Sequence, residues 1–219
     1  MAKRKIKSQY DDWLERIVDI SNHAAGLLRR REIFREYQDM INVNAKIHRP
    51  PDFHNWVKMN YADSIVMSIR RELDYGPTTG SLRRLLEEIR DNYELITRQA
   101  YINRWVEDAP DETAIADACF TELAGNGSTF DPRIAIADIK VLDALGSDIK
   151  KYVNKNIAHR EKINKPIKLT YEKLHKFIDD YEAVVIKYHS LLTGDGYSTL
   201  LPVSINNWKI IFHESRIEK

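Results

Sequence analysis

The chain of 219 residues is 43% hydrophobic and 31% charged, and its formal net charge is +1. These values are typical of one globular domain, with or without an appendage, and they exclude an attraction to nucleic acid that rests on net charge alone. The single cysteine, Cys119, excludes an intramolecular disulfide, and the lack of any apolar run of about 18 residues predicts a cytoplasmic protein without a membrane span.

Helical periodicity dominates the first half of the chain. Apolar residues at spacings of three and four predict helices over residues 10–47 and 54–73, and Pro50-Pro51 separates the two because proline removes a backbone donor. Ser81 is predicted to cap a third helix, whose apolar stripe extends as far as Trp105. A shorter helix is predicted over residues 112–123.

In the second half, Asp131-Pro132 is typical of an N-cap followed by proline in the first helical position. We expect a long helix from there to about Arg160 and a last helix over residues 171–192. Trp208 lies in a tail that we expect to dock on the rest of the protein.

No segment alternates for long enough to predict a sheet, so the expected fold class is all-α, a bundle of about five to seven helices with a long N-terminal helix. We predict an N-terminal helical segment over residues 1–52 and a helical domain over residues 53–219. One continuous domain over 1–219 is the alternative.

Standard enzyme signatures are absent from the sequence. It contains no glycine-rich phosphate loop, no Gly-x-Ser-x-Gly string and no His-Glu-x-x-His string. The seven histidines are scattered along the chain. We therefore predict neither a metal site nor a cofactor.

Positive charge is concentrated over residues 147–176, where lysines and arginine outnumber acids by nine to three. Two interpretations stay open, a solvated helix face beside a basic loop and a surface that attracts phosphate. Within this stretch, His159 stands near the expected end of a helix, where the macrodipole favours a protonated imidazole. Such a group can move a proton during phosphodiester cleavage, or it can simply cap the last carbonyls of the helix.

The string Asn154-Lys155-Asn156-Ile157-Ala158-His159-Arg160-Glu161 resembles the signature of the HEPN superfamily, named for higher eukaryotes and prokaryotes nucleotide-binding. The layout of the chain from about residue 54 resembles the abortive-infection branch of that superfamily. Other strings that carry the resemblance are Ser68-Ile69-Arg70-Arg71-Glu72-Leu73-Asp74 and Ser81-Leu82-Arg83-Arg84-Leu85-Leu86. The resemblance implies a HEPN-like helical bundle, metal-independent RNA cleavage in antiphage or toxin–antitoxin defence, and a homodimer with a shared active site.

Transferred onto this sequence, the resemblance makes His159 the catalytic acid/base and Asn154 its polar support. The candidates for phosphate contacts are Lys151, Lys155, Arg160 and Arg70, although Arg70 can equally pair with Glu72, Asp74 or Asp63 in a structural salt bridge.

The resemblance is incomplete at one position. Active family members carry an arginine about four to six residues before the histidine, usually followed by a polar residue, and Val153 takes the arginine's place here. Valine cannot stabilise phosphate charge. Three hypotheses stay open: an RNA-cleaving or RNA-binding effector, a catalytically inactive HEPN module that binds nucleotide or a protein partner such as an antitoxin, and a purely structural helical protein.

Overall fold

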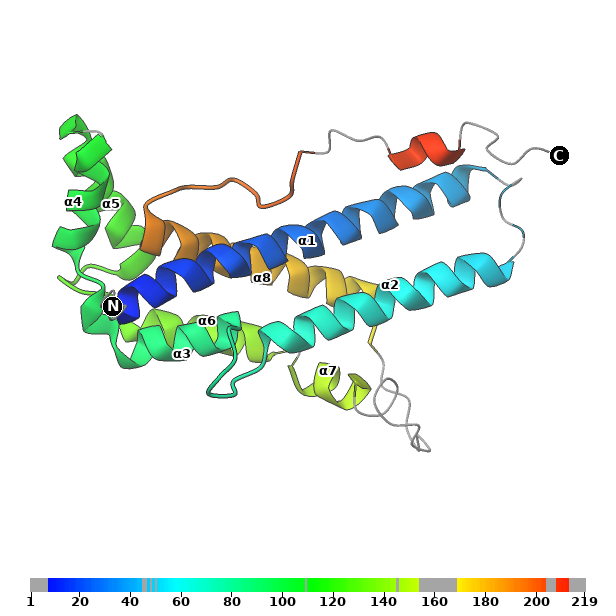
Figure 1. Cartoon of the computed structure of the whole chain (residues 1–219), viewed down its shortest axis with the longest axis horizontal. Coiled ribbons are helices and arrows are strands. Elements are labelled where there is room, and N and C mark those ends of the chain that lie inside the picture. The colour runs from blue at the N-terminus through cyan, green and yellow to red at the C-terminus, as the bar shows by residue number, and fades with distance from the viewer. Residues whose placement is uncertain are drawn as a thin grey trace, which may run out of the picture.

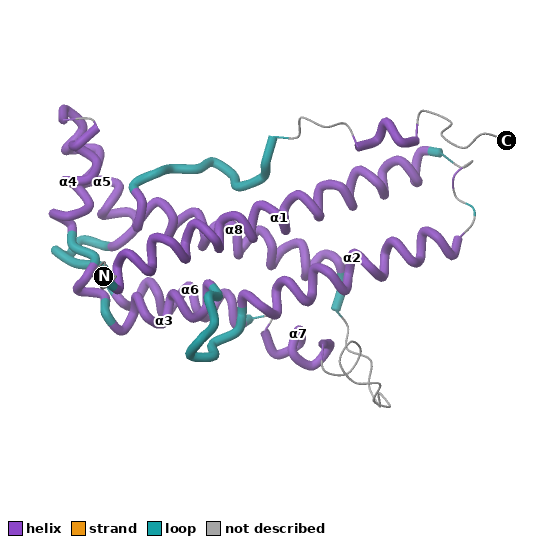
Figure 2. The backbone as a smooth tube through the Cα atoms, in the orientation of Figure 1, coloured by secondary structure: helices purple, strands orange, loops and turns teal. Residues whose placement is uncertain are grey.

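The computed structural model describes residues 8–44, 47, 49, 51–108, 110–144, 146–153, 169–203 and 208–212. Over these residues it contains eight α-helices and no β-strand, which confirms the predicted all-α class (Figure 2). The only strand-like feature among them is an isolated bridge between Thr97 and Thr129. No helix in this part of the chain is long and apolar enough to cross a membrane.

Two long helices define the length of the molecule. The predicted long N-terminal helix is α1, Gln9–Val43, and α2, Pro51–Glu72, runs back beside it (Figure 1). The Ser8 side chain caps α1 by accepting from the backbone N–H of Asp11, whose carboxylate accepts from Ser8 in return. Helix α2 begins at Pro51, three residues before the predicted start, because proline is well suited to a first helical position.

The predicted third helix is divided in the structure. Helix α3 spans Leu82–Asp91, a 3₁₀ turn spans Tyr93–Leu95, and α4 spans Arg98–Asp108. Ser81 caps α3 as predicted. The interruption has a tertiary cause, because backbone groups of Ile96 and Arg98 hydrogen-bond to the chain at residues 128–130, and Ile96 and Thr97 are therefore non-helical just before α4 begins at Arg98.

The predicted long helix from Asp131 to about Arg160 is also divided. After α5, Thr113–Ala124, the chain forms α6, Pro132–Asp143, and then the short α7, Gly146–Tyr152. Asp131 caps α6 as predicted. The break falls next to Gly146, and glycine is a poor helix former. The predicted end near Arg160 lies outside the described residues.

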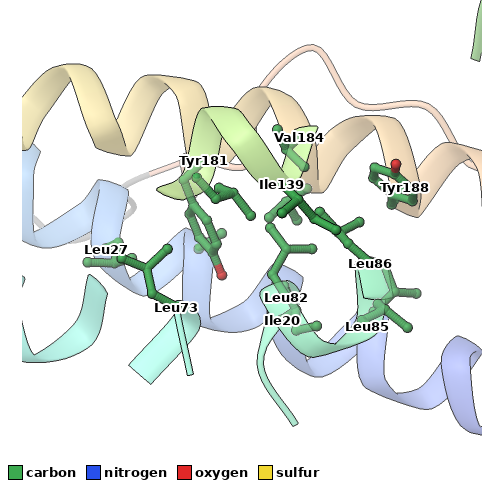
Figure 3. Close-up of a cluster of buried hydrophobic side chains, with 14 of the residues drawn as sticks. Ile20, Leu27, Leu73, Leu82, Leu85, Leu86, Ile139, Tyr181, Val184 and Tyr188 are labelled. Carbon is green, nitrogen blue, oxygen red and sulfur yellow. The ribbon is translucent and has the colours of Figure 1, made fainter. Parts of the chain in front are cut away.

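Helix α8, Tyr171–Thr193, runs through the centre of the fold. Buried side chains from all eight described helices form one hydrophobic cluster with it. Figure 3 shows this core where α1, α3, α6 and α8 meet, with Tyr181 and Val184 of α8 facing Ile20, Leu27, Leu82 and Ile139. Helix α1 therefore belongs to the same core as the remaining helices.

The tail docks on α1, as predicted for the segment around Trp208. The 3₁₀ helix Trp208–Phe212 lies beside the C-terminal half of α1 (Figure 1). The indole N–H of Trp208 donates to the Glu36 carboxylate at 2.5 Å, and Lys209 pairs with the same carboxylate at 3.0 Å.

Candidate functional site

The structure describes two of the six predicted site residues. Asn154, Lys155, His159 and Arg160 lie outside the described residues. Arg70 sits in the last turn of α2, where its guanidinium lies 3.7 Å from the Asp74 carboxylate. Arg70 therefore forms a structural salt bridge, which was one of the two roles that the sequence allowed for it. Lys151 is exposed on α7.

Val153, which stands where the family's arginine is expected, follows directly after α7 and is 7% exposed. Its side chain belongs to the hydrophobic core, as does Ile149 one turn earlier. A side chain at this position is enclosed by the core and has no access to a phosphate.

An open cavity of about 730 Å³ lies beside this end of α7. Tyr152 lines one side of it, and Leu169 and the first turn of α8 line another. Residues 154–168, which contain the motif, therefore lie in sequence between two residues at the cavity. Val153, next to Tyr152, precedes the segment, and Leu169 follows it. The remaining lining comes from α2: Asn55, Lys58, Met59, Ala62, Asp63 and Val66.

The start of α8 holds its part of the cavity in a fixed position. The Thr170 hydroxyl caps the helix by accepting from the N–H of Lys173. The Tyr171 phenol donates to the carbonyl oxygen of Lys58 at 3.2 Å and so ties α8 to α2. Its ring also packs against Phe34 of α1, with 5.4 Å between centroids.

One carboxylate, Asp63, lies among the aromatic groups of the cavity. Burial, and then the negative charge of Asp63, raises the pKa of the Tyr152 phenol. Burial raises the pKa of Tyr171 as well, and the negative charges of ionised Tyr152 and of Asp63 raise it further by smaller amounts. Both phenols therefore keep their protons at neutral pH and lie within electrostatic range of Asp63.

The described lining of the cavity is not basic. Lys58 is its one cation, against the carboxylates of Asp63 and Glu172. The free backbone N–H groups at the start of α8 could bind an anion, but Glu172 already occupies one of them. Its carboxylate accepts a hydrogen bond from its own backbone N–H, which lowers the pKa of Glu172. Attraction of a polyanion therefore depends on cations outside this lining.

Tyr61 and His175 form a partly buried polar pair beside the ring of Tyr171. His175 shares a hydrogen bond of 2.8 Å with the Tyr61 phenol, and burial raises the pKa of Tyr61 to about 12. Burial, and then the charges of Arg35 and Arg31, lowers the pKa of His175. The imidazole is therefore neutral at physiological pH. Among the described residues no group of three His, Cys, Asp or Glu side chains is placed to hold a metal ion.

Comparison with known proteins gives one match. A HEPN family model described as AbiU2 matches residues 10–211, which is more than nine-tenths of the chain. The chain belongs to the AbiU2 family of HEPN proteins. No curated protein and no solved structure matches it.

Membership of the AbiU2 family confirms the predicted resemblance and makes this an abortive-infection-related HEPN-like protein. The match includes α1, whereas the resemblance seen in the sequence began at about residue 54.

The cavity of this AbiU2-family protein is the part of the site that the sequence did not reveal. Tyr152, Asp63 and Tyr171 come from three different helices and meet only in the folded chain. The sequence contains no local signal for their meeting. Arg70 and Lys151, by contrast, are absent from the lining that the structure describes.

Proposed function

We propose that this AbiU2-family protein is an RNA-binding effector of antiphage or toxin–antitoxin defence, and that His159 serves as the acid/base in metal-independent RNA cleavage. The observation that carries the proposal is the position of the cavity. The segment that contains the motif leaves the described structure beside an open, nucleotide-sized space and returns to it there.

The chemistry sets two requirements. In metal-independent cleavage the ribose 2′-oxygen attacks the adjacent phosphorus and the bond to the 5′-oxygen breaks, which leaves a 2′,3′-cyclic phosphate and a 5′-hydroxyl. One proton leaves the 2′-hydroxyl and one is added to the 5′-oxygen, and an imidazole can perform either transfer. The phosphoryl group also gains negative charge, which a nearby cation must stabilise.

Residue 153 cannot meet the second requirement, because valine is uncharged and buried. In this proposal Lys155 and Arg160, with Lys151 at the exposed end of α7, supply the charge. A homodimer brings a second set of the same residues to the site, and an antitoxin is the expected protein partner.

A second candidate function follows from the same valine. A HEPN module that has lost the arginine can keep its phosphate affinity and lose cleavage, and it then acts by binding nucleotide or a protein partner. Val153 favours this candidate, because its side chain carries no charge and is buried in the core, where it cannot contact a phosphate.

The test measures binding of fluorescently labelled single-stranded RNA at several salt concentrations, together with its cleavage. Lys155→Ala should weaken binding and flatten its salt dependence, because fewer counterions are released when fewer phosphates are contacted. Lys140→Ala is the matched control, because Lys140 is exposed on α6 and is absent from the cavity lining. It should leave both properties unchanged.

His159→Ala should lower any cleavage rate by roughly 10²–10⁴ and leave binding intact. Asn154→Arg places an arginine within the family's spacing without altering Val153, and it should accelerate cleavage. If the wild-type protein binds but cuts only with this substitution, the second candidate describes the natural protein. If neither protein binds RNA, the proposal is wrong.

A further inference from the structure

Asp63 has no cationic partner among the residues that the structure describes. No described lysine, arginine or histidine nitrogen lies within 4.0 Å of its carboxylate, whereas Glu72 and Asp74, near the end of α2, each have such a contact. The side chain is partly buried and lines the cavity. Partial burial of an ionised carboxylate costs free energy unless it gains donors, so a ligand with N–H groups is favoured at this point.

The composition of the lining favours a flat, aromatic ligand. The lining includes the buried apolar side chains of Val66 and Leu174 and the aromatic residues Tyr152 and Tyr171. Aromatic residues of this kind stack on nucleobases, and such stacking contributes about 1–3 kcal/mol per base. A volume of about 730 Å³ admits a nucleotide.

The charge of the cavity favours a base over a phosphate. Asp63 and Glu172 repel phosphate oxygens, and only Lys58 attracts them. A base is uncharged and can approach the carboxylates, while the phosphates of the nucleotide remain outside the cavity.

The hydrogen-bonding pattern selects one base. Two carboxylate oxygens are both acceptors, so the complementary edge must carry two adjacent donors. On the Watson–Crick edge, guanine offers such a pair, its N1–H and its N2 amino group. Adenine and cytosine each place a ring acceptor beside the amino group, and uracil flanks its single donor with two carbonyls. A carboxylate repels each of these acceptors.

We propose that the cavity between α2, α7 and α8 is a guanine-binding pocket, in which Asp63 accepts from N1–H and N2–H and Tyr152 and Tyr171 enclose the ring. The proposal rests on the proposed function, since it names the base of the RNA that this protein binds. It makes Asp63 the specificity-determining residue of the site.

The experiment compares three short fluorescein-labelled oligouridylates that differ in one central nucleotide, which is guanosine, adenosine or inosine. Dissociation constants are measured by fluorescence anisotropy. The wild-type protein should bind the guanosine oligonucleotide roughly five- to a hundredfold more tightly than the adenosine one. Inosine keeps N1–H and lacks the amino group, so it should fall between them.

Asp63→Asn is the informative variant. The asparagine amide offers one acceptor and one donor, which match adenine at its amino group and N1 and match guanine at N1–H and O6. The preference for guanosine over adenosine should therefore be lost, whereas loss of a charge that makes no contact with the base would leave it unchanged. Asp19→Asn is the matched control, because it removes the same charge from an exposed position on α1 that is absent from the cavity lining. It should retain the preference for guanosine.

The outcomes separate the two proposals. If the wild-type protein binds all three oligonucleotides with equal affinity, or if Asp63→Asn keeps the preference of the wild type, the guanine pocket is wrong and RNA binding stands. If it binds none of them, the proposed function fails as well. Competition by N-acetyl-arginine amide but not by guanosine monophosphate would also overturn the pocket, and would assign the carboxylate to an arginine of a protein partner.

Discussion

Replacing Val153 by arginine is the direct attempt to restore the family's motif, and the structure predicts that it fails. The valine side chain is 7% exposed and belongs to the hydrophobic core next to Ile149. An arginine there must either bury its guanidinium without a partner or displace the end of α7. We therefore expect destabilisation and no gain of RNA cleavage.

The size of the effect follows from the burial. An uncompensated buried charge typically costs about 3–5 kcal/mol, which is a large part of the roughly 5–15 kcal/mol that stabilises a folded protein. For a chain of this length, each kcal/mol lowers the melting temperature by about 2–4 °C. We expect the midpoint of thermal unfolding to fall by roughly 6–20 °C.

Circular dichroism at 222 nm, followed against temperature, measures this change. Ser147→Arg is the matched control, because it adds the same side chain to α7 at an exposed position. It should alter the midpoint by no more than about 2 °C. If Val153→Arg melts with the control and the wild type, position 153 is accessible, and the argument against a charge at this position is wrong.

Two further predictions concern buried polar groups. Arg31, which is 8% exposed, donates to the Asp179 carboxylate at 2.5 Å and to the carbonyl oxygen of His175 at 3.2 Å, so Arg31→Ala should lower the free energy of unfolding in urea by about 1–3 kcal/mol. Arg35→Ala, one turn later and exposed, should lower it by less than about 0.5 kcal/mol, and equal losses would contradict the assignment. Burial raises the pKa of Glu72, so ionisation of this carboxyl weakens the folded state and its stabilising contribution is lost as pH rises through the folded pKa. The test uses a His23→Gln parent, which lacks the imidazole that lies 3.6 Å from the Glu72 carboxylate. As the pH rises from 4 to 8, the free energy of unfolding of the variant that also carries Glu72→Gln should increase relative to that of this parent. A difference that stays constant with pH would show that the pKa of Glu72 is not raised.

Much of the fold was predictable because its helices are specified locally. Ser81 and Asp131 each cap the helix that the sequence assigned to them. The division of two predicted helices into shorter ones was not predictable, because the spacing of apolar residues carries no information about backbone hydrogen bonds to distant residues. Ile96 and Thr97 are non-helical where the backbone pairs with residues 128–130, and this pairing exists only in the folded chain.

The candidate site divides in the same way. The motif around His159 is a continuous string and is visible in the sequence, whereas the cavity is assembled from α2, α7 and α8. Asp63 looked like a salt-bridge partner of Arg70, yet Arg70 pairs with Asp74, two residues after the end of α2. That Asp63 has no cationic partner among the described residues is visible only in the folded chain.

The end of α7 relates the missing arginine to the proposed base pocket. Successive residues of a helix point about 100° apart, and here Lys151 is exposed, Tyr152 lines the cavity and Val153 enters the core. Of these three positions, 152 is therefore the one from which a side chain reaches the cavity. Its tyrosine lies one residue before Val153, which stands in the arginine's place. In the proposed function, loss of the arginine removes a group that stabilises phosphate charge and Tyr152 provides a ring on which a base can stack, so the site favours retention of RNA over its cleavage.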